Sequence, residues 1–350
     1  MSKQSLVTIQ VKQLRQQRGW SQVQLAKSAG ISRAAVSAIE IQRLVPSVAA
    51  ALALARVLGT SVEELFGGSE PAEETWAWSP SNDSCRYWRA LVRGRILRIP
   101  VELTVAGMLA HDGVFQNGKE KLVREINPRQ TLVMASCDPA ASLLASEYER
   151  ATGLRLLPLY RSSRQALDLL QRGVVDIAGI HLAPARNEKA NSQEAKAVLG
   201  PGFSLLRIAT WDEGLAVDPS VAKSSVDSLV RARLRWVGRE KGAGARQCQD
   251  ELLGNRSEPD HVARDHAGVA EAIRSGWADV GVCLRVVCDQ AGLKFVHVRD
   301  EAYDLCFPTA LESDHRVKKL LEVLRSPALQ SLFTSLPGYE LSRQVECRAI

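Results

Sequence analysis

Apolar residues in positions 8–66 recur at spacings of three, four and five, which is the pattern of short amphipathic helices. Ser21, Ser32 and Ser47 each precede one of these segments, and serine is a favoured residue at a helix N-terminus. Gly19 and Gly30 stand where the first two segments end. The pattern predicts four short helices and a closing turn over residues 60–66.

From Thr131 onward, short apolar runs alternate with longer amphipathic segments. This alternation predicts an α/β domain with a mostly parallel sheet covered by helices on both faces. The predicted strands are 132–135, 154–160, 175–180, 205–210, 214–217, 234–238, 278–283 and 294–298.

Between these two regions lies a connector of different composition. Residues 67–80 are acidic and rich in Gly and Pro, which predicts a linker whose Trp76 and Trp78 dock on neighbouring structure. Alternating runs follow, and Asn117-Gly118 predicts a two-residue hairpin turn between two of them. We therefore expect three parts: a helical domain over 1–68, a linker and small β element over 69–130, and the α/β domain over 131–350.

Composition places the chain among soluble proteins with a substantial core. It has 350 residues, of which 45% are hydrophobic and 24% are charged. No apolar stretch approaches the roughly 20 residues that span a membrane, and the polar N-terminus lacks a signal core. Seven cysteines without a C-x-x-C pair indicate reduced thiols, with neither zinc nor disulfides. We expect a cytoplasmic protein that does not contact membranes.

The positive charge is concentrated in the first fifth of the chain. The net charge is +6, and residues 1–68 hold eight basic and three acidic side chains. A small basic domain on a nearly neutral body is typical of a nucleic-acid reader carried by another domain.

The helical segments carry a specific set of residues. The segments 20–22 (WSQ), 29–33 (AGISR), 36–40 (VSAIE) and 61–66 (SVEELF) resemble the Xre/Cro-type helix-turn-helix family of phage repressors. The resemblance implies that the domain binds a double-stranded DNA operator as a homodimer, with Leu44, Val45 and the connector tryptophans as candidate dimer contacts. It also implies a set of DNA-binding residues: Gln22, Ser32, Arg33, Ala34, Ser37 and Arg43.

Two features of this set affect how bases would be read. The planar fork of Arg33 can bind guanine O6 and N7 together. The Asn and Gln side chains that usually read bases in this family are absent, Ala34 and Ala38 offer only methyl groups, and Gln42 replaces a glycine. We expect sparse base readout, with thymine methyl groups and DNA shape contributing.

The α/β region also shows family-like segments, at 143–153 (LLASEYERATG), 167–182 (LDLLQRGVVDIAGIHL), 235–246 (RWVGREKGAGAR) and 269–282 (VAEAIRSGWADVGV). They resemble periplasmic-binding-protein-like domains, more closely the molybdate-binding-like branch that regulators carry behind a helix-turn-helix module. The resemblance implies a type II, two-lobed α/β fold. Lobe one would comprise 131–210 and 304–350, and lobe two 211–303, with crossings near 209–214 and 302–308.

Four strand-to-helix turns, at 136–138, 161–163, 240–246 and 265–267, would meet at the cleft between the lobes. Helix N-termini and the nearby Arg161, Lys241 and Arg246 favour a small anion, with an oxyanion as one candidate. The predicted ligand-binding residues are Ser136, Cys137, Asp138, Ser162, Ser163, His181, Gly242, Ala243, Gly244, Arg246 and Tyr303.

The glycine-rich turn departs from the family pattern G-S-G-T-R. Ala243 and Ala245 replace its two hydroxyl residues, which weighs against molybdate itself. A second interpretation stays open, in which Gly242 and Gly244 serve only tight packing.

The familiar catalytic motifs are missing, and we predict no catalytic residue, no metal site and no cofactor. The chain has no G-x-x-x-x-G-K-[ST], no H-E-x-x-H and no G-x-S-x-G. Cys137 and His181 could act as nucleophile and base, but nothing in the sequence pairs them, and a buried thiol beside a core histidine is commoner.

Together these features predict a ligand-responsive, DNA-binding transcriptional regulator. Two alternatives remain: a constitutive DNA-binding protein whose binding-protein fold serves only dimerisation and, less favoured, an enzyme on that fold.

Overall fold

The protein is described by a computed structural model that covers residues 9–41, 43–60, 62–66, 74–102, 109–182, 189–254, 258–342 and 345–350. It forms two compact units, Met1–Ala72 and Glu73–Ile350. Gln42, Ser61 and the first part of the predicted linker, 67–73, lie outside the described residues.

The N-terminal unit is a bundle of short helices, as the apolar spacing predicts. Each of Ser21, Ser32 and Ser47 accepts a backbone N–H of the helix that follows it, which confirms the three predicted N-caps. Gly30, with φ of 65°, ends the second helix in the left-handed conformation that glycine adopts without strain. The helices are α1 (Ile9–Gln17), α2 (Gln22–Ala29), α3 (Arg33–Glu40), α4 (Val48–Val57) and α5 (Val62–Phe66).

The second unit begins with a five-stranded sheet of order β1-β3-β2-β4-β5. Asn117 and Gly118 have φ of 50° and 72° and join β4 to β5, which confirms the predicted hairpin. Trp76 packs edge-on against Tyr87 within this sheet. The strands are β1 (Glu74–Trp76), β2 (Ser84–Val92), β3 (Arg95–Pro100), β4 (Gly113–Gln116) and β5 (Lys119–Leu122).

This small sheet is packed on the α/β region rather than separated from it by a free linker. The buried carboxylate of Asp112 pairs with both terminal nitrogens of Arg155, at 2.7 Å each. Trp88 and Ile99 share one apolar cluster with Val133 and Leu167 of the α/β region. Both sheets therefore belong to the same compact unit.

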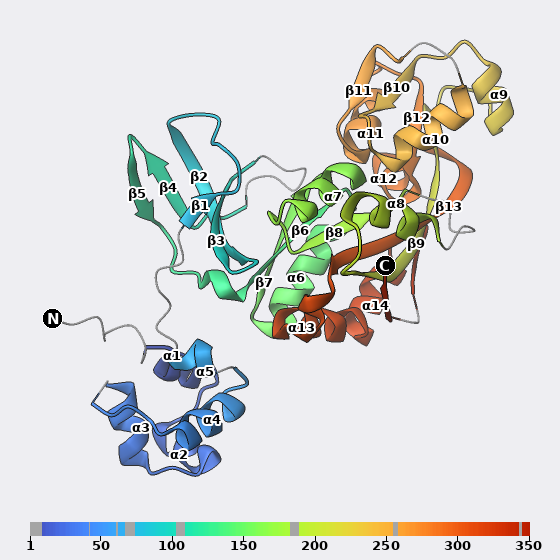
Figure 1. Ribbon diagram of the computed structural model, residues 1–350. Coiled ribbons are helices and arrows are strands. Elements are labelled where there is room, and N and C mark those ends of the chain that lie inside the picture. The colour runs from blue at the N-terminus through green and yellow to red at the C-terminus, as the bar shows by residue number, and fades with distance from the viewer. Residues whose placement is uncertain are drawn as a thin grey trace. The chain divides into compact units, whose positions relative to one another are not determined.

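A ten-stranded sheet forms the centre of the α/β region, and eight of its strands follow the order β11-β10-β12-β9-β13-β8-β6-β7 (Figure 1). Parallel strands lie at both ends of this order, and β9 and β13 pair antiparallel between them. The strands are β6 (Thr131–Ser136), β7 (Arg155–Tyr160), β8 (Ile177–Ile180), β9 (Phe203–Val217), β10 (Trp236–Arg239), β11 (His261–Ala263), β12 (Val280–Leu284), β13 (Lys294–Pro308), β14 (Tyr339–Leu341) and β15 (Cys347–Ala349).

Helices connect the strands at both ends of the sheet. Those that follow β7, β10 and β11 begin within the predicted strand-to-helix turns, whereas the helix after β6 begins at Ala141, three residues beyond the predicted turn 136–138. The helical segments are η1 (Pro128–Gln130), α6 (Ala141–Thr152), α7 (Ser163–Gln171), α8 (Ala190–Leu199), α9 (Val226–Arg231), α10 (Gly244–Leu253), α11 (His266–Arg274), α12 (Arg285–Ala291), η2 (Thr309–Ser313), α13 (His315–Leu324) and α14 (Pro327–Thr334).

The middle of the sheet differs from the prediction. The strands expected at 205–210 and 214–217 are one strand of 15 residues, β9, and the strand expected at 294–298 continues to Pro308 as β13. Polar residues such as Glu213 interrupt the apolar run, but the strand continues because Glu213 pairs with Arg299 across the ladder. The prediction of a mostly parallel sheet is therefore wrong for the centre of the sheet, where the strand pairs are antiparallel.

No helix among the described residues is long and apolar enough to cross a membrane.

Candidate functional site

The predicted recognition helix α3 presents its polar side outward. Ser32, Arg33 and Ala34 are exposed, whereas Val36 and Ile39 are buried in the helical core. Arg33 has no hydrogen bond or ion pair with another residue in the described part of the chain. Ser37 is half-buried, and Arg43, beyond the helix, is exposed. These positions remain predictions for DNA contact.

A buried ion pair fixes α3 against the start of α2. The carboxylate of Glu40 accepts hydrogen bonds from Arg15 at 2.6 and 3.0 Å, and from the side-chain amide of Gln22 at 2.9 Å. Burial raises the pKa of Glu40, but the hydrogen bonds from Arg15 and Gln22 outweigh burial, so the pKa is lowered. Gln22, the predicted phosphate contact, is thus held at the N-terminus of α2 by a residue of α3.

In the second unit, the turn after β6 is held by a chain of buried hydrogen bonds. The Ser136 hydroxyl lies 2.6 Å from the Tyr303 hydroxyl and accepts the Asp138 backbone N–H. Tyr339 donates its hydroxyl to the Asp138 carboxylate at 2.7 Å. Burial raises the pKa of Asp138 to about 6.

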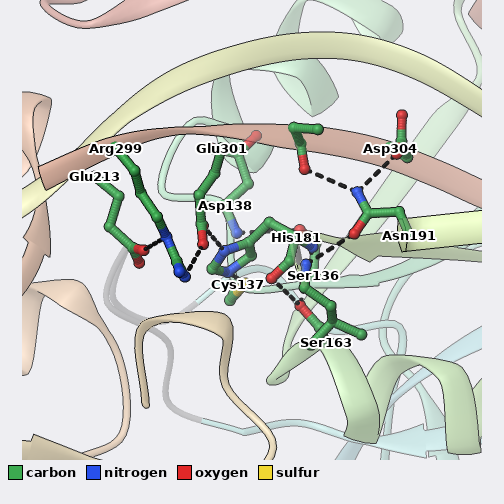
Figure 2. Close-up of polar contacts among 12 residues, drawn as sticks. Ser136, Cys137, Asp138, Ser163, His181, Asn191, Glu213, Arg299, Glu301 and Asp304 are labelled. Atoms are coloured by element: carbon green, nitrogen blue, oxygen red, sulfur yellow. Dashed lines mark hydrogen bonds and ion pairs between the residues drawn. The ribbon is translucent and has the colours of Figure 1, made fainter. Parts of the chain in front are cut away.

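His181 stands at the centre of the buried polar groups, directly after β8 (Figure 2). Its Nε2 lies 2.8 Å from Cys137 Sγ, and its Nδ1 lies 2.6 Å from Glu301 Oε2. Its backbone N–H donates to the Ser163 hydroxyl. The fold therefore joins Cys137 to His181, a pairing that sequence spacing did not reveal.

Behind Glu301 lies a second carboxylate, and one guanidinium joins the two. Arg299 Nε is 3.0 Å from Glu213, and Arg299 Nη2 is 2.6 Å from Glu301 (Figure 2). Candidate metal-ligand atoms of His181, Glu213 and Glu301 lie within 4.8 Å of one another. Arg299 contacts both carboxylates, and the pKa of Glu213 is raised to about 8 by burial and by the charge of Glu301, so near neutral pH the pair carries a single negative charge, which Arg299 offsets; we therefore assign no metal to them.

Glu213 should make the stability of the protein depend on pH. Burial and the charge of Glu301 raise the pKa of Glu213 to about 8 from its ordinary 4.5. Between these values the folded chain holds a proton that the unfolded chain has lost. Rising pH therefore lowers the free energy of unfolding, by up to about 1.4 kcal/mol per pH unit.

In the variant Glu213→Gln the side chain at position 213 is uncharged at every pH. The variant therefore does not lose stability in this way as the pH rises. We expect its stability relative to the parent protein to increase steadily from about pH 5 to about pH 8, measured by chemical denaturation. Parallel stability curves for the two proteins over that range would contradict the assignment.

Arg239, at the carboxyl end of β10, is the buried charge that sequence reasoning missed. Its side chain is 0% exposed, and its Nε and Nη1 have no hydrogen-bond partner among the described residues. The charge of Arg239 opposes the rise in the pKa of His181 and, after burial, helps to lower the pKa of His266, which places the guanidinium near both rings. A charged residue at the end of an otherwise apolar strand, just before the glycine turn, was the signal available in the sequence.

His266, at the start of α11, is also buried, and both of its ring nitrogens lack a hydrogen-bond partner in the described structure. Burial lowers the pKa of His266 well below its ordinary value, with Arg239 and His181 adding to the effect. The Arg239 guanidinium has one hydrogen bond, from Nη2 to the Arg264 carbonyl at 3.4 Å. An imidazole without a partner and a guanidinium with two unpaired nitrogens inside a protein indicate a missing ligand or water.

The three cations on which the sequence prediction relied are already paired. Arg161 makes two contacts of 2.7 Å with Glu102, and Arg246 contacts Asp250 and Glu258. Lys241 is largely exposed and lies 3.8 Å from Glu258. The unpaired positive charge at the cleft therefore comes from Arg239 instead.

The glycine-rich turn packs closely against the start of α7 and against His181, which follows β8. The Arg164 N–H donates to the Gly242 carbonyl, and a Cβ at Gly244 would overlap the His181 carbonyl oxygen and lie 2.7 Å from its Nδ1. Gly242, Ala243 and Arg246 line a pocket of about 530 Å³ on the outer side of this contact. The predicted ligand residues thus divide into this pocket group and a buried group around His181.

The comparisons with known proteins agree with this architecture. Residues 11–65 match a helix-turn-helix family, and residues 145–325, more than half of the chain, match the PBP superfamily domain. The chain belongs to the PBP superfamily, and it carries an Xre-type helix-turn-helix at its N-terminus.

Individual relatives are distant. An uncharacterized protein of Bacillus subtilis, YvgK, is 28% identical over 232 residues, which are 63% of this chain and 75% of that protein. A putative phosphate ABC transporter substrate-binding protein from Clostridium perfringens, with bound phosphate, matches with a TM-score of 0.49 and 11% identity over 61% of this chain and all of that one. A phosphate transport receptor from Vibrio cholerae matches over the same shares with a TM-score of 0.43 and 14% identity.

Proposed function

We propose that the protein is a transcriptional regulator whose DNA binding responds to a small anion held in the cleft of the α/β domain. The observation that carries the proposal is the Arg239 guanidinium, fully buried with two nitrogens unpaired among the described residues. A buried charge without a partner costs several kcal/mol. An anionic ligand would remove that cost, and so would be bound in preference to a neutral one.

The ligand would lie between the lobes assigned from sequence, 131–210 with 304–350 and 211–303. Arg239 and His266 come from lobe two, and Ser162 and His181 come from lobe one. A ligand that contacts both sides stabilises the closed arrangement and shifts the population of the two lobes toward it. That differential affinity is the physical requirement for coupling to DNA binding.

DNA binding is assigned to the helix-turn-helix unit. We propose that Arg33, exposed at the start of α3, reads a base pair and that Gln22 contacts a phosphate. One such domain covers a half-site, so an operator with two half-sites about 34–36 Å apart requires two chains. Leu44 and Val45 are 44% and 86% exposed and are the apolar contacts proposed for that dimer, whose place of action would be the cytoplasm.

The Arg33→Ala variant tests the DNA assignment. Loss of a bidentate guanine contact should cost about 1–3 kcal/mol on the operator and little on random DNA. The matched variant Gln22→Ala should weaken binding to both DNAs equally, because a phosphate contact does not depend on sequence. Fluorescence anisotropy with operator and random DNA measures the affinities of both variants. In a separate measurement, native mass spectrometry should show two chains per operator. An equal loss on both DNAs for Arg33→Ala would remove Arg33 as a base reader.

A further inference from the structure

We propose that Cys137, His181 and Glu301 form a nucleophilic centre in the cleft, which binds a small 2-oxo carboxylate through a reversible bond between Cys137 Sγ and its carbonyl carbon. The proposal deepens the proposed function, since it rests on the cleft binding an anion.

The first step is the geometry of the three side chains. His181 is buried completely, and its two ring nitrogens are each engaged, with the Cys137 thiol at 2.8 Å and the Glu301 carboxylate at 2.6 Å. A thiol, an imidazole and a carboxylate in this sequence of contacts are the arrangement that activates a cysteine nucleophile. The carboxylate orients the ring and stabilises the imidazolium that forms when the thiol gives up its proton.

The surrounding charges support transfer of that proton. Burial alone would lower the pKa of His181, but the hydrogen bond and charge of Cys137 and the charge of Glu213 outweigh burial and Arg239, so the pKa is raised. The other charged groups at this position are Asp138 and Arg299, and His266 faces the ring at 6.1 Å between centroids. Arg299 holds Glu301 from the side away from His181, so the carboxylate is fixed.

The imidazole contact distinguishes Cys137 from other buried cysteines of the described structure. Cys283 is also buried, but its Sγ lies against the backbone carbonyl of His266 and not against an imidazole nitrogen. Cys306 is buried as well, and no imidazole contacts it in the described structure; burial and Asp304 raise its pKa to about 12. Cys306 is therefore a buried thiol without the arrangement found at Cys137.

The ligand class follows from what stands beside the thiol. Arg239, whose charge acts on the His181 ring, and His266, whose ring centroid lies 6.1 Å from that of His181, would hold a carboxylate, and Cys137 with His181 offers a nucleophile and a proton donor together. In the bonding step the thiolate sulfur attacks the carbonyl carbon and the C–S bond forms. The π electron pair moves to the carbonyl oxygen, which takes the proton from the His181 imidazolium. No group leaves, and the reverse step releases the ligand unchanged.

The thiolate is tested first, in the full chain without ligand. Near neutral pH, the ultraviolet absorption of a thiolate should be present in the parent protein and absent from Cys137→Ser and Cys137→Ala. The matched variant Cys306→Ala should keep it, and Glu301→Gln should reduce it, because Glu301 is a positioning residue for His181. Equal thiolate absorption in the parent and both Cys137 variants would overturn the proposal.

The covalent bond is tested with pyruvate carrying carbon-13 at the carbonyl carbon. On binding, the carbonyl resonance should be replaced by one typical of a tetrahedral carbon bonded to sulfur, and only in proteins that retain Cys137. If pyruvate raises the melting temperature but keeps an unchanged carbonyl resonance, the covalent inference is wrong and the proposed function stands. If no small anion stabilises the protein, the proposed function fails. If the thiolate forms but pyruvate does not bind, the ligand class is wrong.

Discussion

Replacement of Arg239 by alanine should abolish the stabilisation that small anions give to the unit Glu73–Ile350. In the parent protein, a bound anion would neutralise the Arg239 guanidinium, which is fully buried and has two of its three nitrogens unpaired in the described structure. Truncating one partner of a buried charge pair costs about 2–5 kcal/mol, which is a loss of roughly 30-fold or more in affinity. The measurement is the melting temperature in phosphate, sulfate, molybdate and pyruvate, followed by calorimetry on the anions that raise it.

The same variant should be as stable as the parent protein when no ligand is present, or more stable. Removing a buried charge that lacks a partner removes its desolvation cost, whereas removing a structural ion pair would leave a carboxylate unpaired. Arg246→Ala is the matched control, since the guanidinium of Arg246 is paired with Asp250 and Glu258. An Arg239→Ala protein that is destabilised and still binds anions normally would show that Arg239 is structural.

Gly244→Val should prevent the two sides of the cleft from closing. A Cβ at this position would overlap the His181 carbonyl oxygen, and that atom belongs to the backbone and cannot rotate away. The unfolding of either lobe is not required, because opening the cleft relieves the overlap. We expect the loss of anion binding and a larger radius of gyration by X-ray scattering, with the secondary structure intact.

The control for this prediction is Gly268→Ala, on the neighbouring helix α11. Its Cβ would lie 3.3 Å from the Ala263 side chain, which can adjust by a few tenths of an ångström. This variant should keep anion binding. If Gly244→Val binds anions as well as the parent protein does, the glycine turn serves packing alone.

Local patterns predicted the local structure well. The serine caps of α2, α3 and α4, the end of α2 at Gly30 and the Asn117-Gly118 turn depend on interactions within a few residues, and each is found where the sequence placed it. Family-like segments also identified both domains correctly. These features are encoded by spacing along the chain, which a single sequence displays.

Local patterns could not predict the strand pairing at the centre of the sheet or the side-chain contacts at the centre of the site. Glu301 lies 120 residues from His181, and no local pattern pairs them. The polar positions of β9 looked like a strand end because their partners on β13 were not visible in the sequence. Arg161 looked like a free cation because its partner Glu102 belongs to another segment, and so does Glu258, one of the two partners of Arg246. The other partner of Arg246, Asp250, lies four residues along the same helix, a spacing that the sequence does display.

The central claim, that an anion in the cleft changes DNA binding, is tested most directly by operator affinity. The full chain is titrated onto operator DNA at fixed salt concentration, with and without the anion that gives the largest increase in melting temperature. The account predicts a change in affinity of about 5–150-fold for the parent protein, the usual range of allosteric coupling, and no change for Arg239→Ala. Equal operator affinity with and without an anion that demonstrably binds would contradict the account and favour a constitutive DNA-binding protein.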